Sequence, residues 1–218
     1  MSVLHGFGMG IATQNSAGET LDVFYPNPLS NIGDELAAVV SGLSGPLDND
    51  QLAELSKGFS AVGADEQAKL ADQLRTSTGR VVATTLIDNA APASVADAYL
   101  KLHLLSHRKV EPHGTELEGL FGLLPNVAWT DQGAVCLSDL PQRQLDARLK
   151  GAVLEVASVD KFPKMTNYVV PSGVRIAHTA RVRLGAYLGE GTTVMHEGFI
   201  NFNGGTEGPG MIEGRISA

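Results

Sequence analysis

The stretch VPSGVRIAHTARVRLGAYLGEGTTVMHEGFI, residues 170–200, contains the pattern that decides the fold. An aliphatic residue occupies every sixth position, namely Val170, Ile176, Val182, Leu188, Val194 and Ile200. A β-strand that alternates between two faces has a period of two, so it does not explain this spacing. A period of six predicts a left-handed parallel β-helix, in which each six-residue unit forms one face of a triangular coil. We expect the aliphatic side chains to point inward and to stack from coil to coil.

The repeat changes after Ile200. The segment NFNGGTEGPG, residues 201–210, is rich in glycine, and the period returns in phase at Ile212. This interruption predicts a loop that leaves the coil, a place where ligand sites are frequent. The sequence stops at Ala218 with fewer than three coils, whereas a solenoid needs about three repeats and a cap. The expectation is therefore an N-terminal fragment of a longer protein. Two hairpins with accidental spacing are the alternative to the coil.

The residues before the coil predict an α/β region. Apolar residues at helical spacing predict helices after Asp34, after Asp48 and Asp50, over Asp65–Leu74, after Ser94 and over Gln142–Lys150. The run Arg80–Ile87 predicts a strand or a buried helical turn, and Gly151–Val156 predicts a strand. We divide the chain into an N-terminal α/β domain (1–115), a connecting α/β segment (116–168) and the truncated β-helix (169–218).

The composition is that of a globular protein. The 218 residues are 43% hydrophobic and 18% charged, which excludes a disordered or fibrous chain. No run of about 18 apolar residues is present, and Met1–Gly6 lacks the features of a signal peptide. The single cysteine excludes a disulfide framework. These features predict a soluble cytoplasmic protein without a membrane span.

Charge is distributed unevenly along the chain. Residues 1–140 hold 7 Lys and Arg against 17 Asp and Glu, a balance of -10, whereas residues 141–218 hold 9 against 7, a balance of +2. An acidic first part repels phosphates, so nucleic acid is not an expected partner. The second part can attract a small anionic ligand.

Three short motifs have simple structural explanations. The run Gly6–Gly10 resembles part of a dinucleotide-binding loop, but no strand precedes it and its glycine spacing is wrong, so we expect a turn. His103 and His107 share one helical face, a spacing that metal ligands use; a core or surface pair is the favoured interpretation. Cys136 lies in an apolar run, which favours a buried, inert thiol.

Six sequence phrases resemble one enzyme family. They are AYLKLHLLSHR (98–108), LPNVAWT (124–130), SVDKFPKMT (158–166), RVRLGA (181–186), GTTVMHEGF (191–199) and EGPGMIEGRIS (207–217). Together they resemble the second type of tetrahydrodipicolinate N-succinyltransferase, a hexapeptide-repeat acyltransferase of the diaminopimelate and lysine pathway. The resemblance runs over essentially the whole chain and is most specific from Lys161 onward.

The resemblance implies a reaction and a set of site residues. Such enzymes transfer succinyl from the co-substrate succinyl-CoA to the amine of ring-opened tetrahydrodipicolinate, a cyclic dicarboxylate, and need no tightly bound cofactor. Glu213 matches the proposed catalytic glutamate, either as a general base or as a nucleophile that forms an acyl-anhydride. Arg215 and Ser217 match the substrate- and CoA-binding side. From the residues alone, Glu213 and Arg215 are expected to project to one face of one strand, as site residues or as a surface ion pair.

The resemblance also raises the question of a metal ion. Glu197 matches a position that binds Mg²⁺ near the trimer axis in some relatives, but the accompanying aspartate is Ala180 here. One carboxylate per chain is a poor magnesium site unless three copies meet on an axis. Arg175, Arg181 and Arg183 can guide anionic substrates or lie on a solvated face.

Two hypotheses about function follow. The first is a homotrimeric, CoA-dependent N-succinyltransferase whose 218-residue fragment is inactive alone. The second is a non-catalytic assembly module of a hexapeptide-repeat protein, in which the coil only stacks. Loss of CoA release without loss of assembly in a Glu213→Gln variant distinguishes the two.

Overall fold

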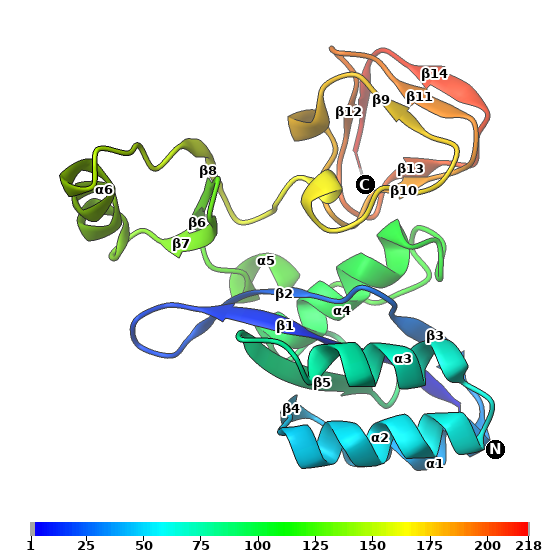
Figure 1. Cartoon of the computed structure of the whole chain (residues 1–218). Helices are drawn as coiled ribbons and strands as arrows, with labels where there is room; N and C mark the ends of the chain where they lie inside the picture. The colour runs from blue at the N-terminus through cyan, green and yellow to red at the C-terminus, as the bar shows by residue number, and fades with distance from the viewer. Residues whose placement is uncertain (1–2, 218) are drawn as a thin grey trace.

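The computed structural model describes residues 3–217 and consists of three parts (Figure 1). A layered α/β part holds the N-terminus, a triangular coil holds the C-terminal residues, and a small sheet with one helix projects to the side. Met1, Ser2 and Ala218, on which the expectations about the two ends of the chain partly rest, lie outside the described residues, as does the side chain of Ala180. Among the described helices, none is long and apolar enough to cross a bilayer.

The N-terminal part is built on an antiparallel sheet. Its strand order is β2-β1-β5-β4, and β3 also pairs with β1. The strands are β1 (Leu4–Gln14), β2 (Thr20–Phe24), β3 (Leu29–Ile32), β4 (Gly45–Pro46) and β5 (Arg80–Leu86). The strand expected over Arg80–Ile87 is therefore confirmed as β5.

The expected turn at Gly6–Gly10 is wrong, because these residues form the middle of the central strand β1. Their glycines allow close packing instead of a turn. A Cβ on Gly10 would lie 2.2 Å from the carbonyl oxygen of Phe24, and one on Gly8 would lie 2.6 Å from a ring carbon of Tyr25. Glycine in a strand interior can mark such an approach by a neighbouring segment.

Helices pack around this sheet. They are α1 (Asp34–Val40), α2 (Asn49–Ala61), α3 (Asp65–Leu74) and α4 (Val95–Ser106), as the sequence predicts. Asp48 and Gln51 form a capping box at the start of α2. Phe7 and Met9 of β1 share a core with Phe59 of α2. The helix α4 packs against β1, β2 and β5 and also contacts the coil.

The connecting segment contains α5 (Leu120–Leu123) and a projection that we call the arm, residues 127–160 (Figure 1). The arm consists of β6 (Val127–Thr130), β7 (Gly133–Cys136), α6 (Leu140–Leu149) and β8 (Val156–Asp160), with strand order β7-β6-β8. The helix expected over Gln142–Lys150 is confirmed as α6. The strand expected over Gly151–Val156 is wrong in its bounds, because β8 begins at Val156.

Short parallel ladders form the coil. The strands are β9 (Arg175–Ile176), β10 (Tyr187–Leu188), β11 (Thr192–Val194), β12 (Phe199–Ile200), β13 (Gly205–Thr206), β14 (Gly210–Ile212) and β15 (Arg215–Ile216), with 3-10 turns η1 (Met165–Asn167) and η2 (Thr179–Arg181). β9, β11 and β14 share one face, β10 and β13 a second, and β12 and β15 a third. Parallel partners such as Arg175 and Thr193 are 18 residues apart, which is three units of six. The accidental-hairpin alternative is therefore wrong.

The inward stack matches the period of six, with one exception. Val182, Leu188, Val194 and Ile200 are fully buried, and Ile176 packs against the same core. Val170 is 64% exposed, so its predicted place in the stack is wrong. The reason is that the first strand of the coil begins only at Arg175, and Val170 precedes it.

The loop predicted over residues 201–210 is also wrong. Gly205 and Thr206 pair in parallel with Tyr187 and Leu188, and Gly210 pairs with Thr192, so the segment continues the coil in register. Glycine is needed here because adjacent turns of the coil touch through the backbone. A Cβ on Gly189 would lie 1.9 Å from the carbonyl oxygen of Glu207.

Candidate functional site

The register of the coil changes at the last corner before the C-terminus. Val194 pairs with Ile212, 18 residues later, but Phe199 pairs with Arg215, only 16 residues later. The corner of the earlier turn contains residues 195–198, and the corner of the next turn contains only residues 213–214. Hydrogen bonds hold the shortened corner on both sides, from Met195 N to Ile212 O (2.9 Å) and from Phe199 N to Gly214 O (3.0 Å).

This corner brings together two residues that the sequence analysis singled out. We call residues 195–198 and 213–214 the carboxylate corner, because Glu197 and Glu213 lie there on successive turns of the coil. The chain shows the equivalence as an internal repeat, with Glu-Gly-Phe-Ile at 197–200 and Glu-Gly-Arg-Ile at 213–216. This four-residue motif recurs at a spacing of 16 residues, and that spacing is the sequence signal that would have predicted the register change.

Glu213 does not lie on one strand with Arg215, so that expectation is wrong. β14 ends at Ile212 and β15 begins at Arg215, which leaves Glu213 in the corner between them. Its side chain is exposed. Among residues 3–217, no ion pair joins Glu213 to Arg215. The expected surface ion pair is therefore absent, and the carboxylate is open to a ligand.

Arg215 belongs to a row of stacked side chains on the face formed by β12 and β15. Its guanidinium carbon lies 4.8 Å from the centroid of the Phe199 ring, and that of Arg183 lies 5.7 Å from the same centroid. Arg183 is fixed by an ion pair to Asp160 (2.7 Å) and by a hydrogen bond to Asn201 (3.1 Å). Arg215 donates from Nε to the hydroxyl of Ser217 (2.8 Å). The structure thus brings Arg215 and Ser217 together.

Two cavities are lined by residues of this region: one by Ser217, the other by Arg183 and Phe199. Ser217 lines a cavity of about 600 Å³ together with Glu111, Pro112, His113, Tyr187, Asn203–Glu207 and Ile216. A second cavity of about 660 Å³ lies between the arm and the coil, where Trp129, Lys164, Arg183 and Phe199 contribute to its walls. The expected anion-guiding role does not suit Arg183, because Asp160 already neutralises it.

The surroundings of Glu197 do not fit a magnesium ion within one chain. Its carboxylate lies 3.4 Å from a guanidinium nitrogen of Arg181 and 4.0 Å from Nε2 of His196. Magnesium prefers several oxygen ligands, and a neighbouring arginine opposes a cation. In the part of the chain that the structure describes, no group of three His, Cys, Asp or Glu residues could hold a metal.

His103 is fully buried and His107 is half-buried, so the structure supports the core interpretation mainly for His103. Their rings stack with centroids 5.9 Å apart. His103 Nε2 accepts a hydrogen bond from Tyr25 N (3.2 Å), so Nδ1 is the protonated nitrogen and donates a hydrogen bond to Tyr99 O (2.7 Å). Burial lowers the pKa of His103 to about 3 and that of His107 to about 4. Both rings are therefore neutral at physiological pH, and their role is structural.

The expectation of a buried thiol at Cys136 is wrong. Cys136 ends β7, and its side chain is only half-buried. The hydroxyl of Ser138 lies 3.2 Å from its sulfur, and this contact lowers the pKa of the thiol. No predicted site residue lies in its strand.

A polar seam that the sequence did not predict joins α4 to the coil. The hydroxyl of Ser106 donates to Ala186 O (3.0 Å) and accepts from Gly185 N (2.8 Å). Arg108 donates to Leu188 O and to Ser172 O (2.8 Å). His113 N donates to Asn203 Oδ1 (2.8 Å). These contacts fix the coil, and hence the carboxylate corner, against the N-terminal part.

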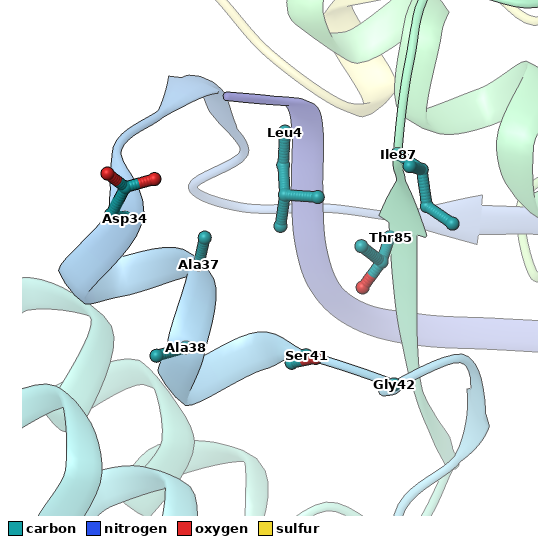
Figure 2. Close-up of a pocket in the computed structure, with 8 residues that line it drawn as sticks. All are labelled: Leu4, Asp34, Ala37, Ala38, Ser41, Gly42, Thr85 and Ile87. Carbon is teal, nitrogen blue, oxygen red and sulfur yellow. The ribbon is translucent and has the colours of Figure 1, made fainter. Parts of the chain in front are cut away.

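A further cavity of about 390 Å³ lies in the N-terminal part, between α1 and the strands β1 and β5 (Figure 2). Small and apolar side chains line most of it, including Leu4, Ala37, Ala38 and Ile87. Among the described residues on its wall, Asp34 alone is charged. None of the predicted site residues reaches this cavity, so it takes no part in the candidate site.

Comparison with known proteins identifies the relatives of this chain. Tetrahydrodipicolinate N-succinyltransferase family profiles match it twice, the N-terminal profile over residues 60–122 and the middle profile over residues 124–164. A 2,3,4,5-tetrahydropyridine-2,6-dicarboxylate N-succinyltransferase of Pseudomonas putida is 58% identical over 100% of this chain. The chain is a homologue of the tetrahydrodipicolinate N-succinyltransferases.

Other relatives and a solved structure agree with this homology. The enzyme of the same name from Vibrio cholerae is 49% identical over 97% of the chain. A crystal structure of a candidate 2,3,4,5-tetrahydropyridine-2-carboxylate N-succinyltransferase from Campylobacter jejuni superposes with a TM-score of 0.87 at 25% identity and covers 100% of this chain. The chain spans 65% of the length of the P. putida relative and 64% of the other two. The predicted resemblance is confirmed.

Proposed function

We propose that this chain forms part of an N-succinyltransferase that acts on tetrahydropyridine dicarboxylate, with succinyl-CoA as the acyl donor. The observation that carries the proposal is the 58% identity to a protein of that name over the whole chain. The exposed carboxylate of Glu213 and the adjacent guanidinium of Arg215 supply groups that this chemistry requires. Such a reaction belongs to lysine and diaminopimelate biosynthesis, for which a cytoplasmic location is expected.

The reaction makes an amide from an amine and a thioester. The acceptor amine attacks the thioester carbonyl, a C–N bond forms, the C–S bond breaks, and CoA leaves as a thiol. The amine must lose a proton during this step, so a carboxylate at the amine is useful as a general base. Glu213 is our candidate for that base; attack by its carboxylate to form an acyl-anhydride is the alternative route.

Arg215 and Ser217 are our candidates for binding the negatively charged substrates. A guanidinium presents a planar set of donors that matches a carboxylate or a phosphate. The Ser217 hydroxyl, which accepts a hydrogen bond from Arg215 Nε, helps to hold that group. Both substrates carry anionic groups, so the slightly basic charge of residues 141–218 favours their approach.

The wider architecture belongs to the same proposal. We propose that the coil is a left-handed β-helix and that the chain divides into residues 1–115, 116–168 and 169–218. We also propose a homotrimer, in which three copies of Glu197 meeting on an axis would be needed to hold Mg²⁺. Neither nucleic acid nor a membrane is an expected partner of the proposed enzyme.

The test is the release of CoA thiol from succinyl-CoA in the presence of the cyclic dicarboxylate. The natural polypeptide that carries these residues is compared with its Glu213→Gln variant, because glutamine keeps the size of the side chain and removes its basicity. General acid–base catalysis contributes about 10²- to 10⁴-fold, so we expect kcat to fall by at least about 100-fold. Glu190→Gln, at an exposed glutamate elsewhere on the coil, is the matched control and should retain full activity.

The same variants distinguish the enzyme from an assembly module. Sedimentation velocity should give the same oligomer for wild type and Glu213→Gln, since an exposed side chain does not support the fold. Wild-type protein that assembles but never releases CoA would refute the transferase proposal. Equal turnover by wild type and Glu213→Gln would refute the role of Glu213.

A further inference from the structure

We infer that Phe199 is a positioning residue that holds the guanidinium of Arg215 so that its two terminal nitrogens face a substrate carboxylate or phosphate. This inference rests on the proposed function, because it assigns a purpose to Phe199 only if Arg215 binds an anion. It adds a residue from the preceding turn of the coil to the candidate site.

The change of register is the first observation that supports it. Because the coil is two residues shorter at the carboxylate corner, Arg215 pairs directly with Phe199 across β12 and β15. With the 18-residue spacing of the other ladders, residue 217 would lie there instead. The shortened corner therefore creates the contact between the aromatic ring and the guanidinium, and it does so beside Glu213.

The second observation is that Phe199 also contacts an arginine that is itself held in place. Arg183 approaches the ring within 5.7 Å. Its guanidinium is also 5.2 Å from the Phe162 ring, and Asp160 and Asn201 fix its nitrogens. The support thus runs from β8 of the arm through Arg183 to Phe199 and on to Arg215. An exposed arginine on an isolated turn would lack this support.

The third observation concerns the donors of Arg215. Its Nε donates to Ser217 Oγ, and within residues 3–217 no acceptor is bonded to either terminal nitrogen. A guanidinium with both terminal nitrogens available can bind a carboxylate through two parallel hydrogen bonds. Long side chains lose considerable rotamer freedom when they are ordered, so stacking on Phe199 lowers that loss at the moment of binding.

The test measures binding of succinate, a simple dicarboxylate probe, to the natural polypeptide by isothermal titration calorimetry. Phe199→Leu removes the aromatic face and keeps an apolar side chain; Phe199→Tyr keeps the face. Cation–π contacts at exposed sites are worth about two- to fivefold in affinity, so we expect Phe199→Leu to weaken succinate binding by about that factor. Phe199→Tyr should bind succinate as tightly as wild type does. Arg215→Gln should weaken binding more than Phe199→Leu does.

A matched control is available elsewhere in the chain. Phe121 is exposed and has Lys161 Nζ 5.2 Å from its ring centroid, so Phe121→Leu removes a comparable contact that does not involve Arg215 or Phe199. It should leave the succinate affinity unchanged. If Phe199→Leu binds like wild type while Arg215→Gln does not, the inference is wrong and the role of Arg215 stands. If Arg215→Gln binds like wild type, the proposed role of Arg215 fails and the inference fails with it.

Discussion

The helices α4 and α6 have similar lengths and opposite environments. Every residue of α4 from Ala98 to Ser106 is buried, including Lys101 and His103, whereas α6 has no buried residue. α4 lies between the N-terminal sheet and the coil, and α6 lies on the projecting arm (Figure 1). Apolar spacing predicted both helices, yet burial depends on which elements pack around a helix.

The polar side chains of α4 show how the difference is sustained. Lys101 Nζ donates to Asn89 Oδ1 (3.2 Å) and to Thr115 Oγ1 (3.1 Å). Ser106 is bonded to the coil on both sides of Gly185. A buried polar group destabilises a fold unless it is hydrogen-bonded, so these partners allow a helix with polar residues to be buried on all sides.

The largest expected effect on stability is the difference between truncating a buried leucine in α4 and an exposed leucine in α6. Leu100 of α4 is fully buried and packs beside Gly8 of β1. Leu100→Ala leaves a cavity, and we expect it to lower the free energy of unfolding by about 2–5 kcal/mol. Leu149 of α6 is 76% exposed, so Leu149→Ala should change that free energy by less than about 0.5 kcal/mol. Urea unfolding followed by circular dichroism measures both; equal losses would contradict the contrast.

The sequence predicted elements better than it predicted contacts. The period of six identified the coil, and apolar spacing together with the caps at Asp48 and Ser94 identified the helices. Glycine caused the main errors at Gly6–Gly10 and at residues 201–210. In both segments glycine permits a close backbone approach within a sheet or coil, and a single sequence does not distinguish this use from a turn.

The site shows the same division between identity and geometry. The family resemblance singled out Glu213, Arg215 and Ser217 as site residues. Their arrangement depends on the shortened corner, which pairs Phe199 with Arg215. The repeated Glu-Gly pairs at 197 and 213 indicate this register. The inward aliphatic period of six alone places Ile212 correctly but does not predict that the next corner is two residues shorter.

The second prediction uses the pH dependence of the buried helix. Burial lowers the pKa of His103 from about 6.5 to about 3. The unfolded chain therefore binds a proton that the folded chain does not, and stability is lost as the pH falls below about 6.5. Between neutral pH and pH 5 this residue alone should lower the free energy of unfolding by about 2 kcal/mol.

Matched variants isolate the contribution of His103 to this loss. His103→Gln should flatten the decline of stability between pH 7 and pH 5, even though it lowers stability at pH 7 by disturbing the bond to Tyr99 O. His196→Gln, at an exposed position of the coil, should leave the curve unchanged. Urea midpoints measured at half-unit pH intervals give both curves. A decline of the same steepness in His103→Gln and wild type would show that His103 is not its source.

The smallest expected effect concerns how the two helices begin. Ser94 Oγ accepts a hydrogen bond from Asp97 N (3.1 Å) at the start of α4, whereas Asp139 makes no cap bond to α6 and accepts bonds from Ser16 instead. Ser94→Ala should lower the free energy of unfolding by about 1 kcal/mol, and Ser94→Asp should keep most of it, because aspartate also caps. Asp139→Ala should affect stability less than Ser94→Ala does. A larger loss at Asp139 would mean that its bonds to Ser16 anchor the arm to the N-terminal sheet, and that the exposed helix depends on this tertiary contact more than the buried helix depends on its cap.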